Sequence, residues 1–180
     1  MGKTKILVMV GGLCRDSLNR QLFGNVRKLY GDKFEFDEVD IAAIPYYSQD
    51  LEKNPPAAVK DLKERIAACD GVLFVTPEYN RSFPGVLKNA VDWGSRPHGN
   101  NSWTGKPAAI IGATPGNIGT FGAQNHLRQV LTGVSIRTME APQFYYSSTG
   151  DMEDGKLSEN SSAYLKEFLG AFEDWMAKLK

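Results

Sequence analysis

The first predicted element of the chain is the stretch Lys5-Ile6-Leu7-Val8-Met9-Val10-Gly11-Gly12, a continuous apolar run that ends at two glycines. A short apolar run without polar alternation is typical of a strand buried on both faces of a sheet. After the glycines the apolar residues change to helical spacing, from Leu18 to Tyr30, and Gly31 then stops the pattern. The stretch therefore predicts a buried strand, a glycine loop and a helix in direct succession.

The same alternation continues to the end of the chain. Four more strands are expected, at residues 34–39, 72–75, 107–111 and 135–139. Four more helices are expected: over 59–66, from near Pro84 to 91, around 127–131, and over 165–179. Because parallel neighbours need right-handed crossover helices, this alternation predicts a five-stranded parallel sheet covered by helices on both faces.

Composition limits the class of protein. The chain has 180 residues, which predicts a single domain over residues 1–180. Its 21 basic and 21 acidic residues cancel, so no general attraction to nucleic acid or an anionic membrane is expected. We find neither an apolar run long enough to cross a membrane nor a signal-peptide pattern, and two cysteines make no disulfide framework. These features predict a cytoplasmic protein.

The loop after the first strand, Gly11 to Asn19, has the composition of an anion site. Glycines let backbone amides approach a phosphate, a helix N-terminus adds partial positive charge, and Arg15, Ser17 and Asn19 can donate hydrogen bonds. The alternative is purely structural: the glycines make a tight turn, and Ser17 or Asn19 caps the helix.

Three other phosphate chemistries fit this loop less well. It has neither the G-x-G-x-x-G spacing of a dinucleotide site nor the Walker ending Gly-Lys-Ser/Thr. Cys14 and Arg20 do have the C-x5-R spacing of cysteine phosphatases, but the chain contains no Asp-Pro to act as the general acid. A phosphatase is thus a remote alternative.

Two further loops follow predicted strands and are expected at the same edge of the sheet. Residues 76–85, Thr-Pro-Glu-Tyr-Asn-Arg-Ser-Phe-Pro-Gly, combine prolines, an aromatic ring and amides, which suits the edge of a planar heterocycle. The loop after residue 111 contains Gly112, Gly116, Gly119 and Gly122. Two isolated histidines and no C-x-x-C pair offer no metal site.

At this point the sequence resembles a known family. Pro77-Glu78-Tyr79-Asn80, Ser82, Pro84-Gly85, residues 87–90, Asp92 and residues 95–97 closely resemble the NADPH-dependent FMN reductase family, especially its chromate and quinone reductase branch. The resemblance covers nearly the whole chain. It implies a flavodoxin-like three-layer α/β sandwich with strand order 2-1-3-4-5, and an assembly of two or four identical subunits.

The resemblance also implies a cofactor site. Residues that match the family's flavin loops are Gly12, Leu13, Arg15, Ser17 and Asn19 for the phosphate, Pro77, Glu78, Tyr79 and Asn80 beside the isoalloxazine, and Ala113, Thr114 and Gly116 at its other edge. The chain departs from the family at two positions, with Gly12 where serine is usual and Cys14 where arginine is usual.

The activity implied by the resemblance is hydride transfer from NAD(P)H through bound FMN to quinones, chromate or other small oxidants, in a ping-pong cycle. Because the cofactor carries this chemistry, we assign no catalytic acid or base to the protein. Two alternatives use the same fold: a flavodoxin-like electron carrier, and a reductase that releases reduced FMN to a partner. Electron carriers usually have an acidic surface, so the neutral charge of this chain favours the enzyme.

Overall fold

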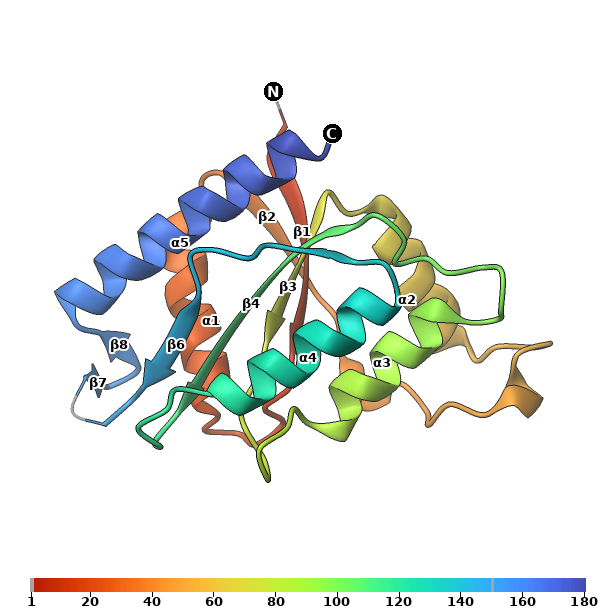
Figure 1. The fold of residues 1–180 in the computed structure, drawn as a ribbon, viewed down its shortest axis with the longest axis horizontal. Coiled ribbons are helices and arrows are strands. Elements are labelled where there is room, and N and C mark those ends of the chain that lie inside the picture. Colours follow the sequence, from red (N-terminus) through yellow and green to blue (C-terminus); the bar gives the residue numbers. More distant parts are fainter. Residues whose placement is uncertain (1, 150) are drawn as a thin grey trace.

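Six parallel strands form the main sheet of the computed structural model, which describes residues 2–149 and 151–180. In chain order they are β1 (Thr4–Val10), β2 (Phe34–Glu38), β3 (Gly71–Val75), β4 (Pro107–Thr114), β5 (Arg137–Thr138) and β6 (Phe144–Ser147). The order across the sheet is β2-β1-β3-β4-β5, and β6 also pairs with β4 (Figure 1). The expected parallel sheet and its strand order are confirmed.

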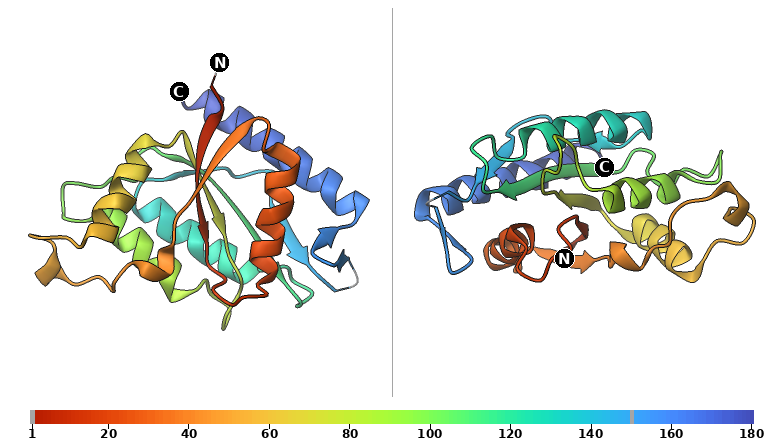
Figure 2. Two further views of the ribbon diagram at one scale, coloured as in Figure 1. Left: turned by 180° about the vertical axis from the view of Figure 1, so that it is seen from behind. Right: turned by 90° about the horizontal axis from the view of Figure 1, so that it is seen from below.

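Within the part of the chain that the structure describes, five helices cover the sheet. They are α1 (Leu18–Tyr30), α2 (Ala57–Ala68), α3 (Gly85–Ser95), α4 (Phe121–Gly133) and α5 (Glu159–Lys178). The buried side chains of α1 and α5 form one apolar cluster with the sheet, and those of α2, α3 and α4 form another on the opposite face. Figure 2 shows these two groups of helices on either side of the strands. The three layers agree with the sequence prediction.

The central strand β1 shows why its sequence has no polar alternation. Leu7 and Met9 contribute to the cluster of α2, α3 and α4, whereas Ile6 and Val8 contribute to the cluster of α1 and α5. None of these four side chains is exposed to solvent. A strand with a helical layer on each face needs apolar residues at every position, because both of its faces lose contact with water.

The fifth strand differs from its predicted extent of residues 135–139. Only Arg137 and Thr138 pair with the start of β4, and β6 then continues the same side of the sheet along residues 111–114 of β4. Pro142 lies between the two segments and has no N–H to donate to a ladder, so the strand is interrupted there. Continuous apolar patterning could not reveal a strand in two pieces.

Two predicted connections contain some regular structure. The loop over residues 41–56 includes the short 3₁₀ turns Ile41–Ala43 and Gln49–Leu51. The polar connection over residues 147–160 includes a small antiparallel hairpin of β7 (Met152–Glu153) and β8 (Lys156–Leu157). The last helix starts at Glu159, before its apolar stripe, because the Ser158 hydroxyl accepts a hydrogen bond from the Ser161 amide and caps it.

The loops that follow β1, β3 and β4 meet at one edge of the sheet, the lower edge in Figure 1. This edge is formed by the carboxyl ends of parallel strands, where ligands of such sheets bind. Within residues 2–149 and 151–180, no helix combines the length and apolar character needed to cross a membrane.

Candidate functional site

Three adjoining hollows lie at the carboxyl edge of the sheet. The first, of about 350 Å³, lies between the loops after β1 and β4 and includes Ser17, Asn19 and Ala113 in its wall. The second, of about 250 Å³, lies between the loops after β3 and β4. The third, of about 270 Å³, includes Leu13, Tyr46 and Val86 in its wall. Glu78 and Thr114 border the first two hollows, and Cys14 and Tyr79 border the first and third. The predicted loops thus form one continuous surface.

The loop after β1 presents an unused hydroxyl at the start of a helix. Ser17 is the N-cap residue of α1, but its side chain makes no capping bond and no other hydrogen bond with the described residues. A Cβ on Gly12 would lie 2.1 Å from Ser17 Oγ, so the glycine keeps this space open. A free hydroxyl and a helix N-terminus beside a glycine cradle fit a phosphate group. The family departure at Gly12 therefore has a local steric reason.

Arg15 lies at the turn of this loop. Its side chain is exposed and makes no ion pair with any described residue. The loop turns tightly just there, because the Ser17 amide donates to the Cys14 carbonyl oxygen over 3.2 Å. The guanidinium is therefore available to an anion at the α1 N-terminus.

Asn19 joins the first loop to the third. Its Nδ2 donates to the Ala113 carbonyl oxygen over 2.9 Å, and its Oδ1 accepts from the Ala113 amide over 2.9 Å. The side chain is 2% exposed, so these two bonds are shielded from water. Asn19 thus holds two of the predicted flavin loops together, a role that the sequence did not indicate. Its predicted contact with phosphate stays a prediction.

The loop after β3 contains a tight two-residue turn. Tyr79 and Ser82 exchange backbone hydrogen bonds of 2.9 and 3.0 Å, and the residues between them are both left-handed, with φ of 51° at Asn80 and 65° at Arg81. This is the backbone of a type I′ turn, which usually has Asn-Gly at its centre. Because arginine replaces glycine, the sequence signal for this turn was absent.

The predicted residues of this second loop separate into buried and exposed members. Pro77 is buried and Glu78 turns its carboxylate towards α4, whereas Tyr79 is 52% exposed and Asn80 is also exposed. Tyr79 borders two of the three hollows. The exposed ring and amide are the side chains of this loop that a bound molecule can reach.

The loop after β4 is fixed by residues that the sequence did not single out. The Thr114 hydroxyl accepts from the Gly116 amide, and the Thr114 carbonyl oxygen accepts from the Ser148 amide over 2.9 Å. Thr149 Oγ1 donates to the Pro115 carbonyl oxygen over 2.8 Å. Ser148 and Thr149 follow β6, so only the pairing of β6 with β4 brings them here.

Tyr46 is a further residue of the site that sequence reasoning did not assign. Its side chain is 81% exposed at the rim of the third hollow. The main chain on both sides of Tyr46 is hydrogen-bonded to α3. Trp93 Nε1 donates to the Pro45 carbonyl oxygen, and the Tyr47 amide donates to Asn89 Oδ1. The paired tyrosines in a proline-containing loop were the only sequence signal, and loop packing explained them equally well.

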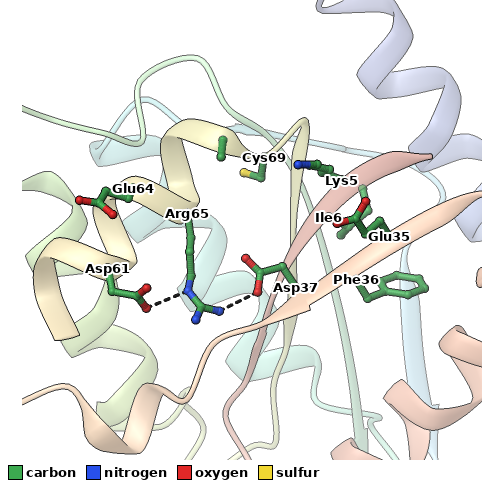
Figure 3. Close-up of a pocket in the computed structure, with 10 residues that line it drawn as sticks. Lys5, Ile6, Glu35, Phe36, Asp37, Asp61, Glu64, Arg65 and Cys69 are labelled. Atoms are coloured by element: carbon green, nitrogen blue, oxygen red, sulfur yellow. Dashed lines mark hydrogen bonds and ion pairs between the residues drawn. The ribbon is translucent and has the colours of Figure 1, made fainter. Parts of the chain in front are cut away.

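A fourth hollow, of about 360 Å³, lies away from the three loops, between α2 and the first halves of β1 and β2 (Figure 3). Its most prominent contacts are ion pairs of Arg65 with Asp37 (2.6 Å) and Asp61 (2.8 Å). Since the guanidinium is satisfied by these carboxylates, the hollow offers no free anion-binding group from Arg65. Its position matches none of the predicted ligand loops.

The phosphatase alternative is disfavoured by the direction of Arg20. Its guanidinium pairs with Glu38 on β2 over 2.8 Å instead of turning to the loop that holds Cys14. Among residues 2–149 and 151–180, no group of three metal-ligating side chains is present either.

Cys14→Ser is therefore expected to leave the reductase activity that the family resemblance implies at the wild-type level, because serine preserves the size of this exposed side chain. Steady-state rates with NADPH and a quinone measure the effect. Complete loss of turnover in a folded Cys14→Ser protein would instead identify the thiol as a nucleophile.

The strand order β2-β1-β3-β4-β5 defines a flavodoxin-like fold, and its three candidate loops lie at the edge where such sheets bind ligands. A flavodoxin from Pseudomonas aeruginosa shares the fold, with a TM-score of 0.61 at 17% identity over 94% of this chain and 99% of that chain.

Residues 4–151 match the NADPH-dependent FMN reductase family, and the chain belongs to this family. A 2-hydroxy-1,4-benzoquinone reductase from a Burkholderia species is 47% identical, over 96% of both chains. A quinone reductase from Pseudomonas putida is 40% identical, over 95% of this chain and 94% of the other. The structure of FerB, a flavoenzyme NAD(P)H:(acceptor) oxidoreductase from Paracoccus denitrificans, has a TM-score of 0.91 at 43% identity, covering 97% of this chain and 98% of that chain. The protein is an FMN-dependent NAD(P)H oxidoreductase.

Proposed function

We propose that the protein reduces quinones and other small oxidants, chromate among them, with electrons from NAD(P)H. The observation that carries this proposal is the free Ser17 hydroxyl beside the Gly12 cradle, in the wall of the first of the three hollows. It is supported by the names of the relatives, since both the Burkholderia and the Pseudomonas putida enzymes are called quinone reductases.

In the proposed site each loop has its own task. The α1 N-terminus with Gly12, Leu13, Arg15, Ser17 and Asn19 binds the FMN phosphate. The main chain and exposed side chains of Pro77, Glu78, Tyr79 and Asn80 flank the planar ring, and Ala113, Thr114 and Gly116 close its other edge. Bound FMN supplies the hydride-accepting and hydride-donating chemistry. The protein binds and orients the reactants, so no acid or base is assigned.

A ping-pong cycle follows if NAD(P)H and the oxidant use the same exposed face in turn. The third hollow, with Leu13, Tyr46 and Tyr79 around it, offers apolar surface to a flat ring. Neutral overall charge suits small diffusing oxidants better than docking to an acidic or basic protein. The electron carrier is for this reason the second candidate.

We further propose that the enzyme is a homodimer or homotetramer of single-domain subunits in the cytoplasm. Five large apolar side chains around the three loops are roughly half exposed or more: Leu13, Tyr46, Tyr79, Ile118 and Phe121. Contiguous exposed apolar surface is typical of protein contacts, so a second subunit would cover part of this rim.

The test of the function starts with the purified protein and added FMN. We expect a yellow protein that keeps one FMN per chain through gel filtration, and parallel double-reciprocal lines for NADPH against a quinone. Converging lines would contradict the shared site, and loss of FMN on the column would favour release of reduced flavin to a partner. A protein that takes up no FMN would overturn the proposal.

A further inference from the structure

The carboxylate of Glu78 is the most buried charged group beside the proposed FMN site. Its side chain is 9% exposed, although it lies in a loop at the open edge of the sheet. A carboxylate is buried only at a cost unless charged or polar partners replace water. Its partners are the Ala123 amide, 3.1 Å from Oε2, and Arg81 Nη1, 3.3 Å from Oε1.

The contact with Ala123 supplies a cap that α4 lacks in its own sequence. Thr120, the N-cap residue of α4, has a left-handed backbone with φ of 67° and makes no capping bond with its side chain. Its hydroxyl accepts from Gln124 Nε2 instead. The first turn of a helix has unpaired amides and a partial positive charge, both of which favour a carboxylate. Glu78 provides that carboxylate from a distant part of the chain.

A second contact ties the same turn to α4. Ser82 Oγ lies 2.8 Å from Nδ1 of His126, one helical turn beyond Ala123. Gly122 permits the close approach, since a Cβ there would come within 3.1 Å of Glu78 Oε2 and 3.2 Å of the Arg81 carbonyl oxygen. The turn between Tyr79 and Ser82 is thus attached to α4 on both of its sides.

This attachment matters because the turn has an unfavourable backbone. Arg81 has no glycine-like freedom, and its φ of 65° is disfavoured for a residue with a side chain. The same turn presents Tyr79 and Asn80 to the hollows. Without external contacts it would be free to relax into another conformation, and the wall of the proposed site would move with it.

We infer that Glu78 is a positioning residue: its carboxylate fastens the Tyr79–Ser82 turn to the first turn of α4 and so fixes one wall of the FMN site. The effect on FMN binding rests on the proposed function, whereas the contact between Glu78 and Ala123 does not. It refines the predicted role of Glu78, since the carboxylate acts on α4 and the residue faces the cofactor with its main chain.

Two substitutions test the inference. Glu78→Gln keeps an oxygen that can accept from the Ala123 amide, whereas Glu78→Ala removes it. In the protein without FMN, we expect amide exchange at Ala123 to become about tenfold faster in Glu78→Ala, the scale of one hydrogen bond to a charged group. Glu78→Gln is expected to stay closer to wild type. Exchange at Leu127, in the middle of α4, serves as the internal control because general destabilisation would accelerate both amides.

FMN affinity gives the second measurement. The dissociation constant of FMN is expected to rise about tenfold in Glu78→Ala, because the hydrogen bond from the Ala123 amide no longer positions the turn. In Glu78→Gln most of the affinity is expected to remain. The visible circular dichroism of bound FMN is expected to change in the alanine variant alone. Glu173→Ala, which removes a carboxylate of α5 that pairs with Lys33, is the matched control and is expected to match wild type.

Two results would overturn the inference. Unchanged exchange at Ala123 in both variants would show that the contact does not hold α4. Equal loss of FMN affinity in Glu78→Gln and Glu78→Ala would show that the charge itself contacts the cofactor. If the wild-type protein bound no FMN, the proposed function would fail. The exchange measurement would still show whether the Glu78 carboxylate holds the first turn of α4.

Discussion

Replacing Gly112 with alanine is expected to destabilise the protein by roughly 3 kcal/mol, the upper end of the usual cost of overpacking. A Cβ at this position would lie 2.2 Å from the Thr76 carbonyl oxygen and 2.4 Å from Thr120 Oγ1. The Thr76 carbonyl oxygen belongs to the main chain at the edge of the sheet. It cannot rotate away, because the Thr76 amide donates to the Ile111 carbonyl oxygen. The clash is relieved only when the loop after β3 moves away from β4.

Because these two elements form opposite walls of the proposed site, Gly112→Ala is also expected to abolish measurable FMN binding. Thermal unfolding checks the stability, with a fall in Tm of about 10 °C for a chain of this size. Gly24→Ala is the matched control. Gly24 lies inside α1, and a Cβ added there would meet no atom within 4 Å, so alanine is expected to raise Tm slightly. A Gly112→Ala protein with wild-type Tm would contradict the packing of this edge.

Asn19→Asp is expected to separate the first and third loops at neutral pH. The carboxylate can still accept from the Ala113 amide, but its other oxygen would face the Ala113 carbonyl oxygen across 2.9 Å without a hydrogen between them. A buried charge with an unsatisfied neighbour costs about 3 kcal/mol or more. The added negative charge would also lie beside the proposed phosphate site, so FMN affinity is expected to fall.

The destabilisation by Asn19→Asp has a defined pH dependence. Only the protonated acid can donate to the Ala113 carbonyl, so folding favours protonation and raises the pKa of this new carboxyl above its unfolded value. Its stability deficit against wild type is therefore largest above the folded pKa and shrinks as the pH falls towards about 3.9, the ordinary aspartate pKa. Urea unfolding of both proteins across this pH range measures the difference in stability.

The control is Asn117→Asp, at an exposed position, which is expected to show no such trend. A pH-independent stability deficit in Asn19→Asp would contradict the paired hydrogen bonds.

Much of the fold was predictable because its signals are local. The unbroken apolar run of β1 records burial on both faces, and the change to helical spacing after Gly12 marks the start of α1 within a few residues. The fifth strand was predicted incompletely because β6 is short and partly polar. It is a strand only because it lies against residues 111–114 of β4.

The three loops of the candidate site were predicted to lie at one edge of the sheet, and they do, whereas the hydrogen bonds that their side chains make within the protein were not predicted. A carboxamide such as Asn19 binds a phosphate or a backbone amide and carbonyl with the same atoms, so its type does not reveal its partner. The turn at Asn80 and Arg81 lacks the glycine by which such turns are normally recognised. Glu78 was itself predicted to lie beside the cofactor, yet its carboxylate points to α4.

The sequence by itself determined the alternation of strands and helices, the three loops that gather at one edge of the sheet and, through its resemblance to a family, the chemistry expected there. These properties depend on hydrophobic periodicity and on motifs of neighbouring residues. The tertiary structure decided which loops are bonded to each other. Asn19 meets Ala113 and Glu78 meets Ala123 only after the sheet has formed, because each pair is far apart along the chain and its geometry is set by the packing of the helices between them.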